Sequence, residues 1–374
     1  MSQTDVTEQS GFVRAIEPLR AFAAISVLML HVIYLSNWMD FPKTGPLAWF
    51  WVGWLGVDIF FVISGFVVTM AAFRELATEN AAPRFSFFIR RFARIAPLYF
   101  LSMAVYLVAV NSEPIKGNEA WFQITTHVFF VHNFFPSTTG AINPPTWTIG
   151  TEMQLYLFVM FVMAWLPKFR PWVFALAIFA IAIGFRYFLY SMNVGAPDSQ
   201  LSHLTTQMPG MIDSFGLGMV LALLKQQGKL PQLGLTQFLV LLVCAVSGLV
   251  ACEQILMSHW ESYWKIWWLP AFFRSFSAIV CGLLVVAAIT LPQKIQISIP
   301  RAFVFLGQIS YGIYLWHFIV IMLLLKYAPM GKPAFVISVL LVTILVAAVS
   351  WIFVERPIVG MAQKYLSNLA KTTA

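Results

Sequence analysis

An arginine and a histidine share one long apolar stretch, which runs from Ile16 to Ser36. Arg20 and His31 are eleven residues apart, and eleven helical steps of about 100° return them to one face, roughly 16 Å apart along the axis. Ionisable side chains inside an apolar span are costly and usually functional. A neutral imidazole can accept a proton from a hydroxyl group. The pair therefore predicts a catalytic site at His31 that is entered from the Arg20 end, although a lone histidine can also pack against a backbone carbonyl.

A base inside an apolar span needs a partner that fixes its protonated nitrogen, and two acidic residues are candidates. Asp58 lies just inside the second apolar stretch, and Glu152 lies at the start of the fourth. Either carboxylate could orient His31 by accepting a hydrogen bond, or could make a structural hydrogen bond or ion pair. We therefore expect Asp58 and Glu152 to join His31 as catalytic residues.

A cluster of arginines follows the second apolar stretch. Its members are Arg84, Arg90, Arg91 and Arg94. Spacings of three and four residues place guanidinium groups on one side of a helix, and arginine binds phosphate through paired N–H donors. Alternatively, such a cluster could serve only to fix the membrane topology of the chain or to contact anionic lipid headgroups. Because Arg20 adds a cation at the same membrane surface, we expect a phosphate-binding site at Arg20, Arg91 and Arg94.

The elements that position these residues are predicted to be membrane-spanning helices. The chain is 60% hydrophobic and only 10% charged, and it contains many apolar runs long enough to cross a bilayer. Ten spans are predicted at about 16–36, 49–72, 95–112, 149–166, 172–191, 209–224, 235–252, 270–290, 303–325 and 334–354. We therefore expect an all-α membrane bundle formed by a single domain over residues 1–374, with short tails at about 1–15 and 355–374.

The positive charges predict how the spans are oriented. Sixteen of the 23 Lys and Arg residues fall on the side of the N-terminus, which places both termini in the cytoplasm. The same bias accounts for the net charge of +8, so we do not expect a nucleic-acid partner. The apolar stretch 121–135, which carries His127 and His132, would invert every later span if it crossed. We interpret it as an interfacial or re-entrant piece on the outer side.

A stripe of small and polar residues lies along the ninth predicted span. Gly307, Ser310, Tyr314 and His317 share one helix face. Such a face must contact protein or a cavity rather than lipid. We expect the small residues to permit close helix packing, and His317 either to support the catalytic residue or to pack in the core.

Several short segments occur in a specific order. They are Leu19–Ala24 through His31, Gly56–Phe66, Arg91–Arg94 followed by Ile95, Pro97 and Tyr99, Trp147–Glu152, Leu306–Gly307 with Ser310–His317, and Glu355–Pro357. Together they resemble the membrane acyltransferase-3 family, whose members include O-antigen and nodulation-factor O-acetylases. Thr148 stands where that pattern has a serine.

This resemblance implies an O-acyltransferase of the bacterial inner membrane, surrounded by membrane lipids. The donor would be a cytoplasmic acyl-coenzyme A, most often acetyl-CoA, and the acceptor a hydroxyl of an envelope carbohydrate or lipid-linked glycan; no metal is expected. His31 would act as general base or acyl carrier, and the three arginines would hold the coenzyme A phosphates. Substrate contacts are expected from Trp147, Tyr314 and His317. The alternative is a proton-coupled transporter or exporter of a polar metabolite, because buried His, Asp and Glu also mark proton relays.

Overall fold

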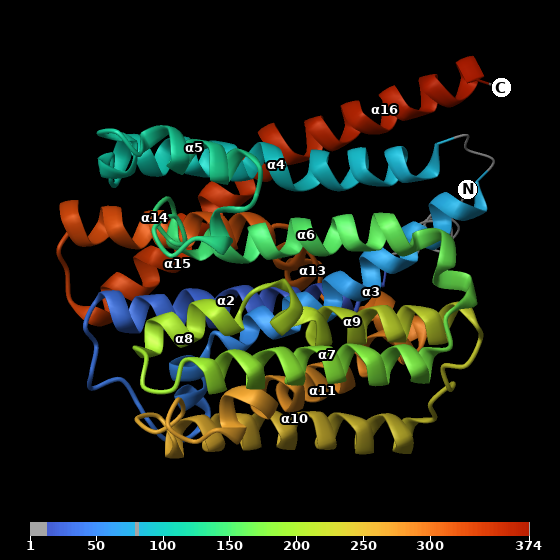
Figure 1. Cartoon of the computed structure of the whole chain (residues 1–374), viewed down its shortest axis with the longest axis horizontal. Coiled ribbons are helices and arrows are strands. Elements are labelled where there is room, and N and C mark those ends of the chain that lie inside the picture. Colours follow the sequence, from blue (N-terminus) through green and yellow to red (C-terminus); the bar gives the residue numbers. More distant parts are fainter. Residues whose placement is uncertain (1–12, 79–81, 374) are drawn as a thin grey trace.

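The computed structural model describes residues 13–78 and 82–373. Over these residues the regular structure is entirely helical, which confirms the all-α prediction. Ten helices are long and apolar enough to cross a membrane, as predicted. They lie side by side along the long axis of the molecule and form one bundle (Figure 1).

The spans alternate with short connecting helices. The long helices are α2 (Ile16–Leu35), α3 (Leu55–Ala77), α4 (Pro83–Ala109), α6 (Trp147–Val162), α7 (Pro171–Met192), α9 (Met208–Gln226), α10 (Leu235–Ser258), α11 (Trp268–Thr290), α14 (Ser310–Tyr327), α15 (Lys332–Ser350) and α16 (Arg356–Thr373). The short helices are η1 (Pro46–Val52), η2 (Glu113–Ile115), α5 (Ala120–Val128), η3 (His132–Phe134), η4 (Pro144–Thr146), η5 (Met163–Lys168), α8 (Asp198–Thr205), α12 (Gln293–Ser298), α13 (Arg301–Gln308) and the π-helical η6 (Trp351–Glu355).

Helices α3 and α9 cross at very close range because glycine occupies the crossing point on both. A Cβ atom added at Gly65 would lie 1.8 Å from the carbonyl oxygen of Phe215, and one added at Gly218 would lie 2.1 Å from that of Val62. Any larger side chain would push the two backbones apart. This contact brings Asp213 of α9 close enough to Asp58 of α3 for the two charges to interact.

Three predicted spans differ most from the helices observed, and the second shows a smaller shift, since α3 begins at Leu55 rather than near residue 49. The third begins at Pro83 rather than near residue 95, so the arginine cluster lies on α4 itself. The ninth is divided into α13 and α14, and α13 packs so closely on α2 that a Cβ atom at Gly307 would lie 2.2 Å from the carbonyl oxygen of Glu17. The tenth continues through η6 into α16, where a tail was predicted. Of the predicted N-terminal tail, residues 1–12 lie outside the described part of the chain.

The stretch 121–135 does not form a span. Its helix α5 has 9 residues, about 14 Å of length, which is too short to cross a bilayer. The rings of His127 and His132 stack at 4.2 Å, and the His132 Nε2 atom lies 3.0 Å from the Thr146 carbonyl oxygen. Burial lowers the pKa of His127 to about 4 and that of His132 to about 3, so both rings are neutral near neutral pH. The stacked pair fixes the segment that leads into α6.

Candidate active site

A wide vestibule opens where the start of α2, the end of α3, the start of α4 and α16 meet. Its volume is about 970 Å³, and five of its lining residues are arginines: Arg20, Arg74, Arg90, Arg91 and Arg94. The Arg90 guanidinium pairs with the Glu75 carboxylate at 2.8 Å. Within the described chain, neither Arg91 nor Arg94 has an ion-pair partner. The predicted grouping of Arg20, Arg91 and Arg94 is therefore present, and it can receive an anion.

A narrow cavity of about 90 Å³ continues from the vestibule toward the middle of the bundle. Arg20, Arg91, Arg94 and Val67 line both spaces. Seven of the remaining side chains of the wall are apolar, and five of these seven come from α3. The polar side chains of the wall are Ser64, Thr148, Glu152, Tyr156, Tyr311 and Tyr314. A charged entrance thus leads into a passage wide enough only for a thin group.

Glu152 is held in this cavity by two hydroxyl groups. Ser64 donates a hydrogen bond to its Oε1 atom at 2.7 Å, and Tyr156 donates to the same oxygen. No described residue donates to Oε2, the second carboxylate oxygen. We expected Glu152 to orient His31, but no contact joins the two among the residues described.

His31 is oriented by a second histidine. Its Nδ1 atom lies 2.9 Å from the Val27 carbonyl oxygen and 3.1 Å from Nε2 of His317. The Nδ1 atom of His317 lies 3.2 Å from the carbonyl oxygen of Ile313. The partner of His31 is therefore neither of the two acids that the sequence suggested but His317, 286 residues further along the chain.

These contacts fix the tautomers of both rings. A backbone carbonyl oxygen only accepts, so the nitrogen facing Ile313 in His317 carries a proton, and Nε2 of that ring is an acceptor. The His31 Nδ1 atom then donates its proton toward Val27 and His317. The Nε2 atom of His31 keeps a free lone pair, and no described residue hydrogen-bonds it. This is the nitrogen that can accept a proton or attack a carbonyl carbon.

Tyr314 lies between the narrow cavity and the two histidines. Its ring is 5.8 Å from that of His317, which is 5.0 Å from that of His31. The Tyr314 hydroxyl donates to the Pro145 carbonyl oxygen at 2.9 Å and accepts from Thr148 at 2.9 Å. His31 itself does not line the cavity. Tyr314 thus separates the cavity that Arg20 lines from His31.

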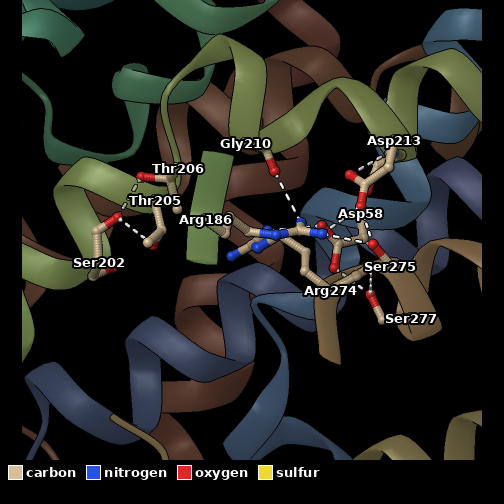
Figure 2. Close-up of polar contacts among 11 residues, drawn as sticks. Asp58, Arg186, Ser202, Thr205, Thr206, Gly210, Asp213, Arg274, Ser275 and Ser277 are labelled. Atoms are coloured by element: carbon tan, nitrogen blue, oxygen red, sulfur yellow. Dashed lines mark hydrogen bonds and ion pairs between the residues drawn. The ribbon is translucent and has the colours of Figure 1, made fainter. Parts of the chain in front are cut away.

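Asp58 lies in a different cluster, together with Arg274 and Ser277 (Figure 2). Its carboxylate accepts hydrogen bonds from Arg274 at 2.8 Å and from Ser277 at 2.5 Å, and no contact with His31 is present among the described residues. The expected catalytic contact of Asp58 is therefore replaced by an ion pair with α11. Sequence alone did not indicate this pair, because the partners are 216 residues apart.

A second buried ion pair lies beside the first (Figure 2). The Arg186 guanidinium bonds Asp213 at 2.7 Å, Ser275 at 2.6 Å and the Gly210 carbonyl oxygen at 2.9 Å. Only 1% of the Arg186 side chain and none of the Asp213 side chain is exposed. All these donors and acceptors are used within the cluster, so it joins α7, α9 and α11 as a structural element.

We expect Asp213→Ala to lower the free energy of unfolding by about 3–5 kcal/mol, because Arg186 would remain buried without its counter-ion. The double variant Arg186→Met with Asp213→Leu should be more stable than the single variant. Thermal unfolding of the purified protein in detergent measures both effects. Asp198→Ala, at the exposed start of α8, is the matched control, and an equal melting temperature for Asp213→Ala and this control would contradict a structural role.

Three further residues are defined by the structure rather than by the sequence. Ser64 and Tyr156 belong to the site through their bonds to Glu152. Glu355, at the end of the π-helical segment, is 5% exposed, and the charges that act on it are those of Arg94 and Arg20.

Trp147 was expected to contact substrate, but it does not line the cavity and is half-buried at the start of α6.

Known proteins are similar to this chain over more than nine tenths of its length. A family model described as an acyltransferase domain, Acyl_transf_3, matches residues 13–355. A Bacillus subtilis protein named "Putative peptidoglycan O-acetyltransferase" is 26% identical over 94% of this chain and 56% of its own length. The peptidoglycan O-acetyltransferase OatA of Listeria monocytogenes is 25% identical over 93% of this chain and 56% of its own length. The chain thus spans a little more than half the length of these relatives. No solved structure matches it.

Proposed function

The chain belongs to the membrane acyltransferase-3 family, and on that basis we propose that it moves an acyl group, acetyl in the simplest case, from a coenzyme A thioester to a carbohydrate hydroxyl. The observation that carries this proposal is an arginine-lined vestibule that continues into a thin cavity. Tyr314 lines that cavity, and its ring is 5.8 Å from the ring of His317, the partner of His31. A phosphorylated head and a narrow reactive arm have the shapes that these two spaces admit.

The donor binds with its phosphates in the vestibule. Arg91 and Arg94 have no acidic partner among the residues described, so they can pair with phosphate oxygens. Arg20 lines both spaces and adds a third cation. We place this end of the bundle in the cytoplasm, where acyl-coenzyme A is made and where the positive charges of the loops predict it.

His31 performs the transfer. As a general base, its Nε2 atom takes the proton of the acceptor hydroxyl while the hydroxyl oxygen attacks the thioester carbonyl carbon. The C–S bond breaks, and the proton passes to the sulfur to give free coenzyme A. As an acyl carrier, Nε2 would first attack the thioester carbonyl carbon and release the coenzyme A thiolate; the acceptor hydroxyl oxygen would then take the acyl group from Nε2, and its proton would pass to the thiolate. On either route His317 holds the ring through the Nδ1 atom of His31.

The acceptor approaches from the end opposite the vestibule. His31 is only half-buried, and the names of the relatives point to peptidoglycan as one acceptor of this kind. A polysaccharide or lipid-linked glycan on the outer side of the bacterial inner membrane has the required hydroxyl groups. We treat residues 1–374 as one membrane domain that carries this activity without a metal ion.

The direct test is acyl transfer by the purified chain. Protein in lipid vesicles, mixed with acetyl-CoA labelled in the acetyl group and with peptidoglycan fragments or lipid-linked glycan, should release coenzyme A and place label on the glycan. Label should be removed by mild base, as expected for an ester. Uptake of a polar metabolite into vesicles with no acyl transfer would contradict the proposal and favour a transporter.

A further inference from the structure

Three polar side chains form a group on the otherwise largely apolar wall of the narrow cavity, and we call them the collar. They are Ser64 on α3 and Glu152 and Tyr156 on α6. Tyr156 is 4% exposed, and Ser64 and Glu152 are half-buried. Burying three polar groups is costly unless they are bonded to each other or to a ligand. The chemistry proposed at His31 does not use them.

The collar lies between the vestibule and Tyr314. Along α3, Val67 lines both the vestibule and the cavity, Ser64 is about one turn away, and Phe60 is another turn away. The Phe60 ring is 6.0 Å from that of Tyr314. On α6, Thr148 bonds Tyr314 and lies one turn before Glu152. A donor held by the arginines must therefore pass the collar before its thioester approaches the histidines.

The hydrogen bonds of the collar leave it able to accept but not to donate. Ser64 and Tyr156 each have one hydroxyl proton. Both hydroxyls can donate to Oε1 of Glu152, and they lie 3.1 Å from each other, so these contacts use both protons. The Oε2 atom has no donor among the described residues. A ligand group that bonds Oε2 of Glu152 must therefore supply a proton. A phosphate beside it would meet the negative charge of the carboxylate, whereas the arginines that attract phosphate also line the vestibule.

We propose that the collar recognises an amide N–H of the donor arm and keeps phosphate groups in the vestibule. This inference rests on the proposed function, because the pantetheine arm of coenzyme A carries amide groups between its phosphates and its thioester. The Oε2 atom of Glu152 accepts the N–H, and Ser64 and Tyr156 hold the carboxylate in position. The collar thus selects donors with an amide-bearing arm and sets how far the thioester advances toward Tyr314.

The test compares two donors in two proteins. One donor is acetyl-CoA, and the other is an analogue of the same length whose arm amides are replaced by esters, which have no N–H. A hydrogen bond to a charged group predicts that the wild type uses acetyl-CoA with a KM lower by about 10-fold or more. Glu152→Gln presents an amide of the same shape without the charge, and it should raise the KM for acetyl-CoA and bring the two donors close to equality.

Further variants separate this result from a general loss of structure. Tyr156→Phe removes one hydroxyl that positions the carboxylate and should reduce the preference in part. Glu113→Gln, an exposed glutamate in η2, is the matched control and should keep the full preference. A Glu152→Gln protein that transfers acyl groups with the wild-type preference overturns the proposed role of the collar and leaves the proposed function intact. A wild type that transfers from neither donor overturns both the role of the collar and the proposed function.

Discussion

Replacing His31 by alanine is expected to lower the rate of acyl transfer by about 10³-fold, the range measured for the loss of a general base. The variant loses the Nε2 lone pair, whereas the arginines that hold the donor are unchanged. The fall should therefore appear in kcat, with the donor KM close to that of the wild type. Initial rates of coenzyme A release at varied acetyl-CoA measure both quantities.

Two other histidines show whether this effect is specific. Among the described residues, the His259 side chain hydrogen-bonds only its own helix end, through Ser258 and Ile255, and its ring faces Trp268. His259→Ala should therefore transfer at the normal rate. His317 is a positioning residue, and His317→Gln keeps an oxygen that can accept the Nδ1 proton of His31. It should retain more activity than His317→Leu. A folded His31→Ala protein with wild-type kcat would refute the proposed mechanism.

The second large effect is expected at the arginines of the vestibule. Arg91→Ala combined with Arg94→Ala removes two cations with no described ion-pair partner, and each charge-assisted hydrogen bond contributes about 1.5–3 kcal/mol. The KM for acetyl-CoA should rise by about 100-fold or more. The KM for the glycan should change little, because the acceptor approaches from the other end of the bundle.

Arg84 provides the matched control for this pair. It lies on the same helix, is exposed, and does not line the vestibule. Arg84→Ala should leave the donor KM near the wild-type value, and direct binding of coenzyme A should show the same ranking of variants. If the double variant keeps the wild-type dependence on acetyl-CoA, these arginines do not bind the donor phosphates.

Periodicity and hydrophobicity predicted what lies within one helix. The number of spans, and the placing of Arg20 and His31 on the first, follow from rules that act over a few turns. The arginine cluster was predicted for the same reason, because residues three or four apart share a face. That the stretch 121–135 does not form a span was also predicted, because a crossing there would have reversed the charge bias of every later loop.

Partners on different helices could not be predicted in this way. Asp58 was assigned to His31, yet it bonds Arg274 on α11. Glu152 was assigned to the same base, yet it bonds Ser64 and Tyr156. All the spans are similarly apolar, so hydrophobicity does not say which of them are neighbours in a bilayer. The close crossing of α3 and α9 at Gly65 decides part of that order.

The sequence by itself determined that this protein is a helical membrane bundle, that one histidine lies inside its first span, and that cations gather on one side. Only the tertiary structure decided that a second histidine orients the first, that the carboxylate of the fourth span faces a narrow cavity, and that two ion pairs join α3 to α11 and α7 to α9. The physical reason is that a single helix fixes the face and depth of each residue. The contacts of that face depend on how several helices pack at once.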